Sequence, residues 1–456
     1  MTRGATARPS LVFGAAVIAS HACQVIWLIA AVRVLPDGTL GSALAAQALY
    51  GVLQIVVDNG AAFHGARLAA RGSLTVEERG LVVRARLELA TVCAALGLAL
   101  AALAGGEMLE AFAPYGVALA LFSLLNVWEP YGEGRVGPYA GYLAARSGVV
   151  AVVLGGAAAV GAEVPVAVVG GCEIVAVLSV GILARAWSAP SRSGQPPVEL
   201  WRAIRDVGAP ALVTQYTFAV GTIALGLAGR TEPAAINGVA TRLLTGLQGL
   251  NGIAATTLFP RLARTAPDTR DTEQARAAAA GVVALSLAAL AVTAVAAPLL
   301  GQLFLEDDSA AVTDALVIAL SAAAASGLIM HITFALVARH RERGVAARSA
   351  AGAAVTTAVA IAAAISGGPS TAAVTAAGFV AGQILTLGLL LRLASRMSLL
   401  DVVSPTAALL AGVAAPAAAI AVVGGGDLAL ALPVASALAA AIVAVRSRPA
   451  PSPTIV

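Results

Sequence analysis

The sequence predicts an all-α membrane protein with about fourteen transmembrane helices, and two observations carry that prediction. Hydrophobic residues make up 59% of the 456 residues, charged residues make up only 11%, and the mean hydropathy is +0.90. A soluble domain cannot bury so large an apolar fraction. Apolar runs of about 20 residues, the length that crosses a bilayer, recur between short polar connections along the whole chain.

The polar connections define the ends of the fourteen predicted spans. These spans are 10–35, 39–63, 81–105, 109–127, 137–161, 164–187, 207–229, 234–260, 277–304, 311–338, 345–366, 370–395, 403–423 and 428–445. The first apolar run is longer than the roughly 7–15 residues of the apolar region of a signal peptide. It is therefore counted as a span.

The charges predict the orientation of these spans. All 28 basic residues are arginine, and 24 of them fall into alternate connections, against Arg33 and Arg230 on the other side. By the positive-inside rule, both termini are cytoplasmic. This distribution accounts for the sequence pI of about 9.3, so no nucleic-acid partner is predicted.

Two six-helix lobes follow from the same topology. Spans 1–6 and spans 7–12 both begin and end on the cytoplasmic side, which predicts a pseudo-two-fold axis along the membrane normal. The predicted parts are an N-terminal lobe, a cytoplasmic linker, a C-terminal lobe, and two peripheral helices with a cytoplasmic tail, at 1–187, 188–206, 207–396 and 397–456. Within the linker, residues 198–207 are predicted to lie on the membrane surface, anchored by Trp201.

The connection between spans 4 and 5 stands out because it cannot be helical throughout. Its helix-breaking residues are Pro130, Gly132, Gly134, Gly137 and Pro138. We therefore expect two separate helices joined by a short exposed turn. Arg146 then lies about two turns into span 5, where a charge in a bilayer costs a few kcal/mol or more, which makes it a candidate functional residue.

Three short sequence motifs lie at or near the ends of predicted spans. The turn W-x-x-Y-G-E-G-R at 128–135 precedes Arg146, the tripeptide D-N-G at 58–60 precedes a basic loop, and span 8 ends in F-P-R-L at 259–262. In this order they resemble the Wzx-type polysaccharide flippases of the multidrug/oligosaccharidyl-lipid/polysaccharide exporter (MOP) superfamily. The resemblance extends over spans 1–12.

The resemblance implies a transporter of the bacterial cytoplasmic membrane. It would move an undecaprenyl-diphosphate-linked oligosaccharide from the inner to the outer leaflet for cell-surface polysaccharide biosynthesis, by alternating access around a cationic cavity. Its partners would be that lipid-linked oligosaccharide, membrane lipids, cytoplasmic glycosyltransferases and a polymerase, and it would need no cofactor. Arginine suits a diphosphate because its planar guanidinium stays charged and can donate two parallel N–H groups to phosphate.

The candidate substrate-binding residues are intramembrane or interfacial. Arg146 and Arg242, one in each predicted lobe, are the candidate cavity arginines; snorkelling or a structural ion pair is the alternative. Arg33 either guards the exit or is an ordinary interfacial arginine. The further polar lining, for which interhelical hydrogen bonds are the alternative, comprises His21, Gln24, Gln54, Gln215, Gln248, Asn251 and Gln383. His331 is predicted to be a packing residue.

Two carboxylates are candidates for ion coupling or gating. Glu173 is the only carboxylate near the middle of any predicted span; it either carries protons or is a structural partner of Arg146. Asp58, at the inner end of span 2, either shapes the cytoplasmic gate or serves as a cap or loop residue. No metal site is predicted, because the acidic run 306–308 is better placed to start span 10. Cys23, Cys93 and Cys172 show no paired spacing.

Two other functions remain open at this point. A drug/cation antiporter of the same superfamily would favour acidic residues in its cavity, whereas this chain has two intramembrane arginines and one glutamate. A membrane-embedded polysaccharide polymerase or ligase would be an enzyme that binds the same lipid diphosphate. Such an enzyme needs a long outside loop, and the predicted outside connections are short, so a transporter rather than an enzyme is predicted.

Overall fold

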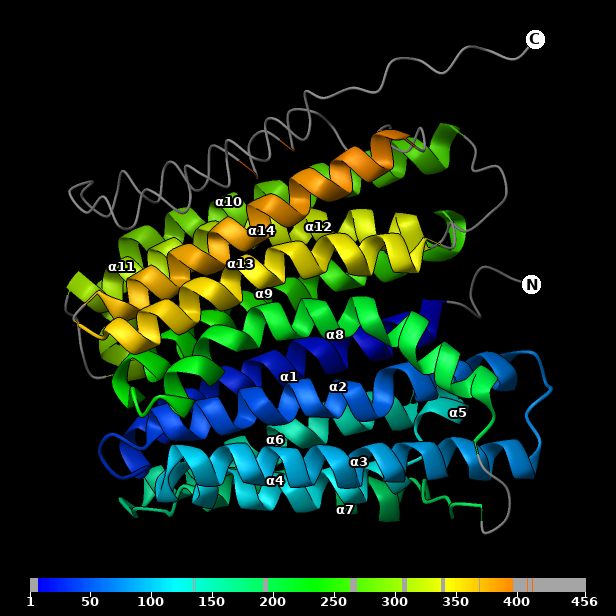
Figure 1. Ribbon diagram of the computed structural model, residues 1–456, viewed down its shortest axis with the longest axis horizontal. Coiled ribbons are helices and arrows are strands. Elements are labelled where there is room, and N and C mark those ends of the chain that lie inside the picture. Colours follow the sequence, from blue (N-terminus) through cyan, green and yellow to red (C-terminus); the bar gives the residue numbers. More distant parts are fainter. Residues whose placement is uncertain are drawn as a thin grey trace. The chain divides into compact units, whose positions relative to one another are not determined.

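The computed structural model in Figure 1 describes residues 7–133, 135, 137–191, 196–262, 269–305, 310–337, 341–368, 370–396, 408 and 412. Fourteen helices are formed by the described residues. They are α1 (Ala7–Val34), α2 (Leu40–Ala70), α3 (Val76–Ala104), α4 (Gly106–Leu124), α5 (Trp128–Gly132), α6 (Gly137–Ala159), α7 (Ala167–Leu183), α8 (Val198–Leu227), α9 (Thr231–Leu262), α10 (Thr269–Leu305), α11 (Ala310–Ser321), α12 (Ala323–Val337), α13 (Glu342–Ser366) and α14 (Thr371–Arg396).

The all-helical fold class is confirmed. Each of the first twelve predicted spans coincides with a helix, except that the tenth is divided at Ala322 into α11 and α12. Ten described segments are long and apolar enough to cross a membrane, by length and composition, and α7 is a shorter apolar helix. Apart from residues 408 and 412, predicted spans 13 and 14 lie outside the described residues, as does the acidic run 306–308.

The chain divides into two compact units. The first comprises Met1–Arg242 with Gln302–Asp307, and the second comprises Leu243–Gly301 with Asp308–Val456. In the first unit, α8 packs along α2. The predicted lobes, by contrast, would divide the chain within the linker at 188–206.

The segment 198–207 is not a separate surface helix, so that prediction is wrong. It forms the beginning of the continuous helix α8. Leu200 is 2% exposed and packs in a cluster with Trp128 and Ala61, and Trp201 packs against the same cluster. Two apolar residues of the segment, Leu200 and Trp201, thus pack within the first unit.

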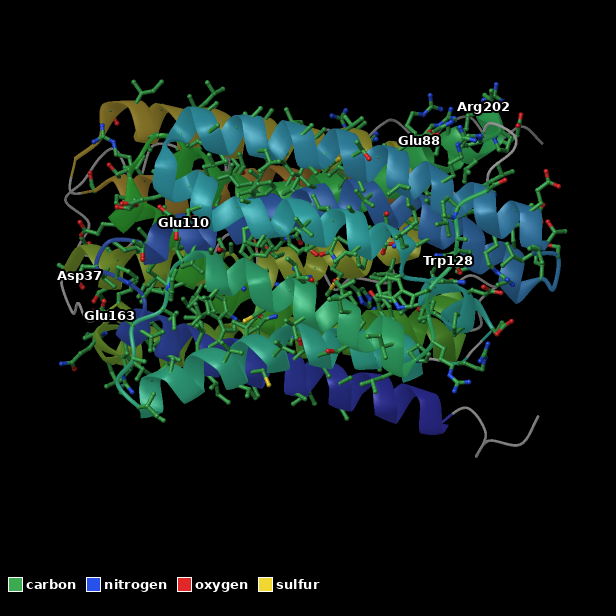
Figure 2. The ribbon with its side chains drawn as sticks, turned by 90° about the horizontal axis from the view of Figure 1, so that it is seen from below. Asp37, Glu88, Glu110, Trp128, Glu163 and Arg202 are labelled. Atoms are coloured by element: carbon green, nitrogen blue, oxygen red, sulfur yellow. The ribbon has the colours of Figure 1, made fainter. Side chains whose placement is uncertain are left out.

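The two ends of the first unit carry different labelled residues in Figure 2. Asp37, Glu110 and Glu163 lie at one end, while Trp128 and Arg202 lie at the other. The first three flank the predicted outside connections, and the last two belong to the predicted cytoplasmic connections. The up-and-down course of the helices thus brings connections assigned to the same side to the same end of the unit.

The connection after α4 is not simply an exposed turn, as the sequence predicted. It forms the short helix α5, and its Trp128 is only 4% exposed. Glycines permit the close approach of α5 to α2: a Cβ at Gly65 would lie 2.3 Å from the Trp128 ring, and a Cβ at Gly132 would lie 2.4 Å from the backbone oxygen of Ala66. These two glycines therefore allow α5 to pack closely against α2.

Gly132→Ala is expected to destabilise the protein by about 1–3 kcal/mol, the usual range for overpacking, because its methyl group would overlap backbone atoms of α2. The matched control is Gly148→Ala in α6, where an added Cβ meets nothing within 4 Å and alanine favours the helix by up to about 1 kcal/mol. Melting temperatures of the two purified variants check this. Equal melting temperatures for both would contradict the tight seating of α5.

The second unit is built on α14. Helices α11, α12 and α13 pack against it, and a core cluster joins residues of α10, α12, α13 and α14, among them Val283, Leu328 and Leu390. The contact between α13 and α14 depends on glycine. A Cβ at Gly352 would lie 2.3 Å from the backbone oxygen of Gly382, so small residues allow the two backbones to touch.

Candidate functional site

The first unit contains an ion pair between two of the predicted residues, Arg146 of α6 and Glu173 of α7. The Nε of Arg146 lies 3.1 Å from Oε2 of Glu173. The side chain of Glu173 is 3% exposed and that of Arg146 is 27% exposed. The glutamate is therefore enclosed, while part of the arginine remains accessible.

Two tyrosine hydroxyls complete the surroundings of the carboxylate. Tyr50 and Tyr142 each donate a hydrogen bond of 2.9 Å to Oε1 of Glu173. Gln54 donates from Nε2 to the hydroxyl oxygen of Tyr142 at 2.6 Å. Tyr50 and Gln54 are four residues apart on α2, as are Tyr142 and Arg146 on α6, and this spacing places each pair on one face of its helix.

Aromatic rings line the same cluster. The guanidinium carbon of Arg146 lies 5.3 Å from the centroid of the Tyr50 ring, within the range of a cation–π interaction. The Tyr50 ring stacks on Tyr115 of α4 with a centroid distance of 4.7 Å. The Tyr115 hydroxyl is buried and has no hydrogen-bond partner among the described residues, so Tyr115 contributes a ring surface only.

The terminal amino groups of Arg146 are not used by its ion pair with Glu173. Its hydrogen bond to Glu173 uses Nε alone. In the part of the chain that the structure describes, neither terminal amino group is hydrogen-bonded to protein, and the side chain is partly exposed. Four N–H groups of a permanent cation can therefore donate to an anion.

Arg242 lies in the first unit and interacts electrostatically with Tyr115 and Arg146 of this cluster. It donates to Oε1 of Gln47 on α2, and its guanidinium carbon lies 4.9 Å from the ring centroid of Trp27 on α1. Trp27 is 1% exposed. Arg242 and Arg146 belong to the same compact unit, whereas the sequence assigned one to each lobe.

The remaining predicted lining residues do not form one cluster. His21 and Gln24 of α1 are hydrogen-bonded, as their three-residue spacing allows. Arg33 is exposed in the last turn of α1. Gln215 of α8 lies beside α2, with its Nε2 3.6 Å from the position of a Cβ on Gly51.

In the second unit, the predicted polar residues make hydrogen bonds between helices. Gln248 of α9 donates to the backbone oxygen of Ala323 at 2.9 Å, next to the break between α11 and α12. Gln383 accepts from Ser326 at 3.0 Å. His331 is 2% exposed. The side chain of Asn251 lies outside the described residues.

Asp58 belongs to a second ion pair, at the end of the first unit where α5 lies. Its Oδ1 is 2.9 Å from Nη2 of Arg86, whose side chain is 0% exposed. Arg86 also donates to the backbone oxygens of Leu125 at 2.8 Å and Phe122 at 3.0 Å. These are carbonyls at the carboxyl end of α4, which carry a partial negative charge.

Arg86 is one of the 24 arginines that were counted with the alternate connections, but in the structure its side chain is buried within the first unit. Helix α3 begins at Val76, after a capping box in which Thr75 and Glu78 bond each other's backbone, so Arg86 lies in the third turn. A carboxylate and two carbonyl oxygens replace the water that a loop arginine would have. The T-x-x-E pattern at residues 75–78 was the sequence signal for this earlier start.

Metal and disulfide chemistry find no support in the described residues. Within them, no three His, Cys, Asp or Glu side chains gather as metal ligands would, and Cys23, Cys93 and Cys172 are free.

Sequence reasoning missed Tyr50, Tyr142 and Arg86. The two tyrosines could have been suspected from their four-residue spacing to Gln54 and Arg146.

A scan against protein-family models and a search of curated proteins found no match. Solved structures do match. One described as "Lipid II flippase MurJ, inward closed conformation" has a TM-score of 0.65 at 10% identity, covering 95% of this chain and 98% of that chain. An inward-facing multidrug resistance MATE family transporter of the MOP superfamily has a TM-score of 0.59 at 14% identity, covering 86% and 98%.

An outward-facing MATE family transporter also matches, with a TM-score of 0.52 at 15% identity, over 86% of this chain and 96% of that chain. At these identities the likeness shows the fold. The predicted all-helical transporter fold is thus confirmed, and the solved structures that share it are transporters and a flippase. The chain is a multi-pass membrane protein with the fold of the MOP-superfamily transporters.

Proposed function

We propose that the protein is a Wzx-type flippase that moves an undecaprenyl-diphosphate-linked oligosaccharide from the inner to the outer leaflet of the bacterial cytoplasmic membrane. The observation that carries the proposal is the geometry of Arg146. Its Nε is held by Glu173, while its terminal amino groups have no protein partner among the described residues. A planar guanidinium presented in this way suits the oxygens of a diphosphate.

The fold and the charge pattern support the same function. Proteins with this fold include a lipid II flippase, whose lipid-linked substrate is of the same chemical class. The arginine bias of the connections supports cytoplasmic termini. In the proposed cycle, two six-helix lobes alternate access around the substrate, which cytoplasmic glycosyltransferases supply and an outer-leaflet polymerase consumes.

A drug/cation antiporter is the second candidate, because multidrug MATE transporters share the fold. A cation site needs a carboxylate free to bind the cation. The one buried carboxylate in this cluster, Glu173, already accepts hydrogen bonds from Arg146, Tyr50 and Tyr142. The described geometry therefore favours an anionic substrate.

Arg146→Lys tests the proposal. Lysine keeps the charge but loses the planar fork, so flipping of undecaprenyl-diphosphate-linked oligosaccharide in proteoliposomes should fall about tenfold or more, the equivalent of about 1.4 kcal/mol. Membrane abundance should stay normal. The control is Arg84→Lys, because Arg84 pairs with Glu88 on a partly exposed face of α3. Full activity of Arg146→Lys, or wild-type export of organic cations without lipid flipping, would contradict the proposal.

A further inference from the structure

We propose that Tyr50 and Tyr142 are positioning residues that force Glu173 to hold Arg146 by its Nε edge alone, leaving both terminal amino groups for the lipid diphosphate. In this arrangement Glu173 is a fixed counter-ion and does not carry protons during transport. The inference rests on the proposed function, because it assigns roles around the same arginine.

The first step concerns the two carboxylate oxygens. An arginine and a carboxylate commonly form a two-point pair, in which two parallel N–H groups meet two oxygens. Here Oε1 of Glu173 already accepts from the hydroxyls of Tyr50 and Tyr142, each at 2.9 Å. Only Oε2 remains for Arg146, and it receives Nε at 3.1 Å. The tyrosines thus prevent Glu173 from accepting a hydrogen bond from a terminal amino group of Arg146.

The second step concerns the direction of the hydroxyl protons. Gln54 donates to the oxygen of Tyr142, so the single proton of that hydroxyl is directed to Glu173. Oε1 then faces donors from two helices and Oε2 faces a third donor. The carboxylate of Glu173 is thus held in place by hydrogen bonds from Tyr50, Tyr142 and Arg146.

The third step concerns the other groups around the carboxylate. The titratable side chains that interact with Glu173 are Arg146 and Tyr142 from α6, Tyr50 from α2, Tyr115 from α4 and the neighbouring Cys172 on α7. Arg146 is the one group among these that is charged near neutral pH. Among the described residues, the cluster thus offers an ion pair and no second carboxylate that could exchange a proton with Glu173.

The experiment compares Tyr50→Phe, Tyr142→Phe and the double variant with Tyr115→Phe, all as full-length protein in nanodiscs. Affinity for undecaprenyl diphosphate is measured by titration, alongside the melting temperature without ligand and the KM and kcat of flipping. Tyr115→Phe is the matched control, because it removes a buried hydroxyl that has no partner among the described residues. Phenylalanine keeps the ring in every case.

We expect the double variant to bind undecaprenyl diphosphate about tenfold more weakly, as for the loss of one charge-assisted hydrogen bond. KM should rise with little change in kcat, and Tyr115→Phe, which removes no hydrogen bond to Glu173, should change KM less than the double variant does. A change confined to the melting temperature, with wild-type affinity, would overturn the inference. The single variants give the same test if the double variant does not fold.

Two further outcomes separate this inference from the proposed function. If the wild-type protein does not bind undecaprenyl diphosphate, or if Arg146→Lys binds it equally well, the flippase proposal fails. If wild type binds and Arg146→Lys does not, but the tyrosine variants bind normally, the positioning role alone fails. A wild-type flipping rate that follows an imposed pH gradient, and loses that dependence in Glu173→Gln, would overturn the fixed counter-ion.

Discussion

Asp58→Asn is expected to reduce the amount of folded protein in the membrane to a small part of the wild-type amount. Asparagine keeps the shape of the side chain and one acceptor oxygen but not its charge, so the fully buried guanidinium of Arg86 would lose its counter-charge and keep only neutral partners, among them the backbone oxygens of Leu125 and Phe122. Removing one partner of a buried ion pair costs about 3–5 kcal/mol. That is a large part of the roughly 5–15 kcal/mol by which proteins are stable.

The measurement is the amount of monodisperse protein extracted from membranes, together with its melting temperature. The double variant Asp58→Asn, Arg86→Met should regain part of the lost stability, because no charge is then buried without a partner. Arg84→Gln is the control: its partner is Glu88, the two side chains are 30% and 46% exposed, and such pairs contribute only about 0–1 kcal/mol.

This comparison also decides the role of Asp58, for which the sequence left a gate and a local structural role open. A residue that only closes a cytoplasmic gate can lose its charge without loss of the fold. If Asp58→Asn accumulates at the wild-type level, melts normally and loses only transport, then Asp58 is a gate residue and its pair with Arg86 contributes little to stability.

The helices could be predicted from the sequence because hydropathy and helix breakers are local properties. Each of the first twelve predicted spans has its helix in the structure. The errors occur where a segment packs against residues that are distant in the sequence. The segment 198–207 resembles a surface helix until Leu200 is seen to pack with Trp128, and the turn after α4 resembles an exposed loop until Trp128 is seen against Gly65.

The candidate site was predictable in part. Arg146 and Glu173 were singled out because ionisable residues within spans are rare, but their contact depends on how α6 and α7 are rotated about their axes. Tyr50 approaches Glu173 from a position 123 residues away in sequence, and a tyrosine in an apolar run carries no signal that it will do so. Arg86 was missed for a different reason. Its neighbours Arg79 and Arg84 made it resemble one of several charged residues in a loop.

Glu173→Gln is expected to lower both the abundance and the melting temperature of the protein. Glutamine retains an acceptor oxygen for the hydroxyls of Tyr50 and Tyr142 but leaves Arg146 without its counter-charge. The destabilisation should be about 2–3 kcal/mol, somewhat below that of a fully buried pair, because the Arg146 side chain is 27% exposed. Arg146→Gln should destabilise less, since Glu173 keeps its two tyrosine donors.

The double variant Arg146→Gln, Glu173→Gln completes the comparison. It buries no unpaired charge, so it should regain most of the stability that Glu173→Gln loses, yet it should not flip lipid-linked oligosaccharide because the phosphate-binding guanidinium is gone. If Glu173 instead carried protons, the single variant Glu173→Gln would melt normally, bind undecaprenyl diphosphate and fail only in ion-driven turnover. Melting temperature, lipid binding and flipping of the three variants in proteoliposomes distinguish these cases, and a stable, fully active Glu173→Gln protein would eliminate both roles.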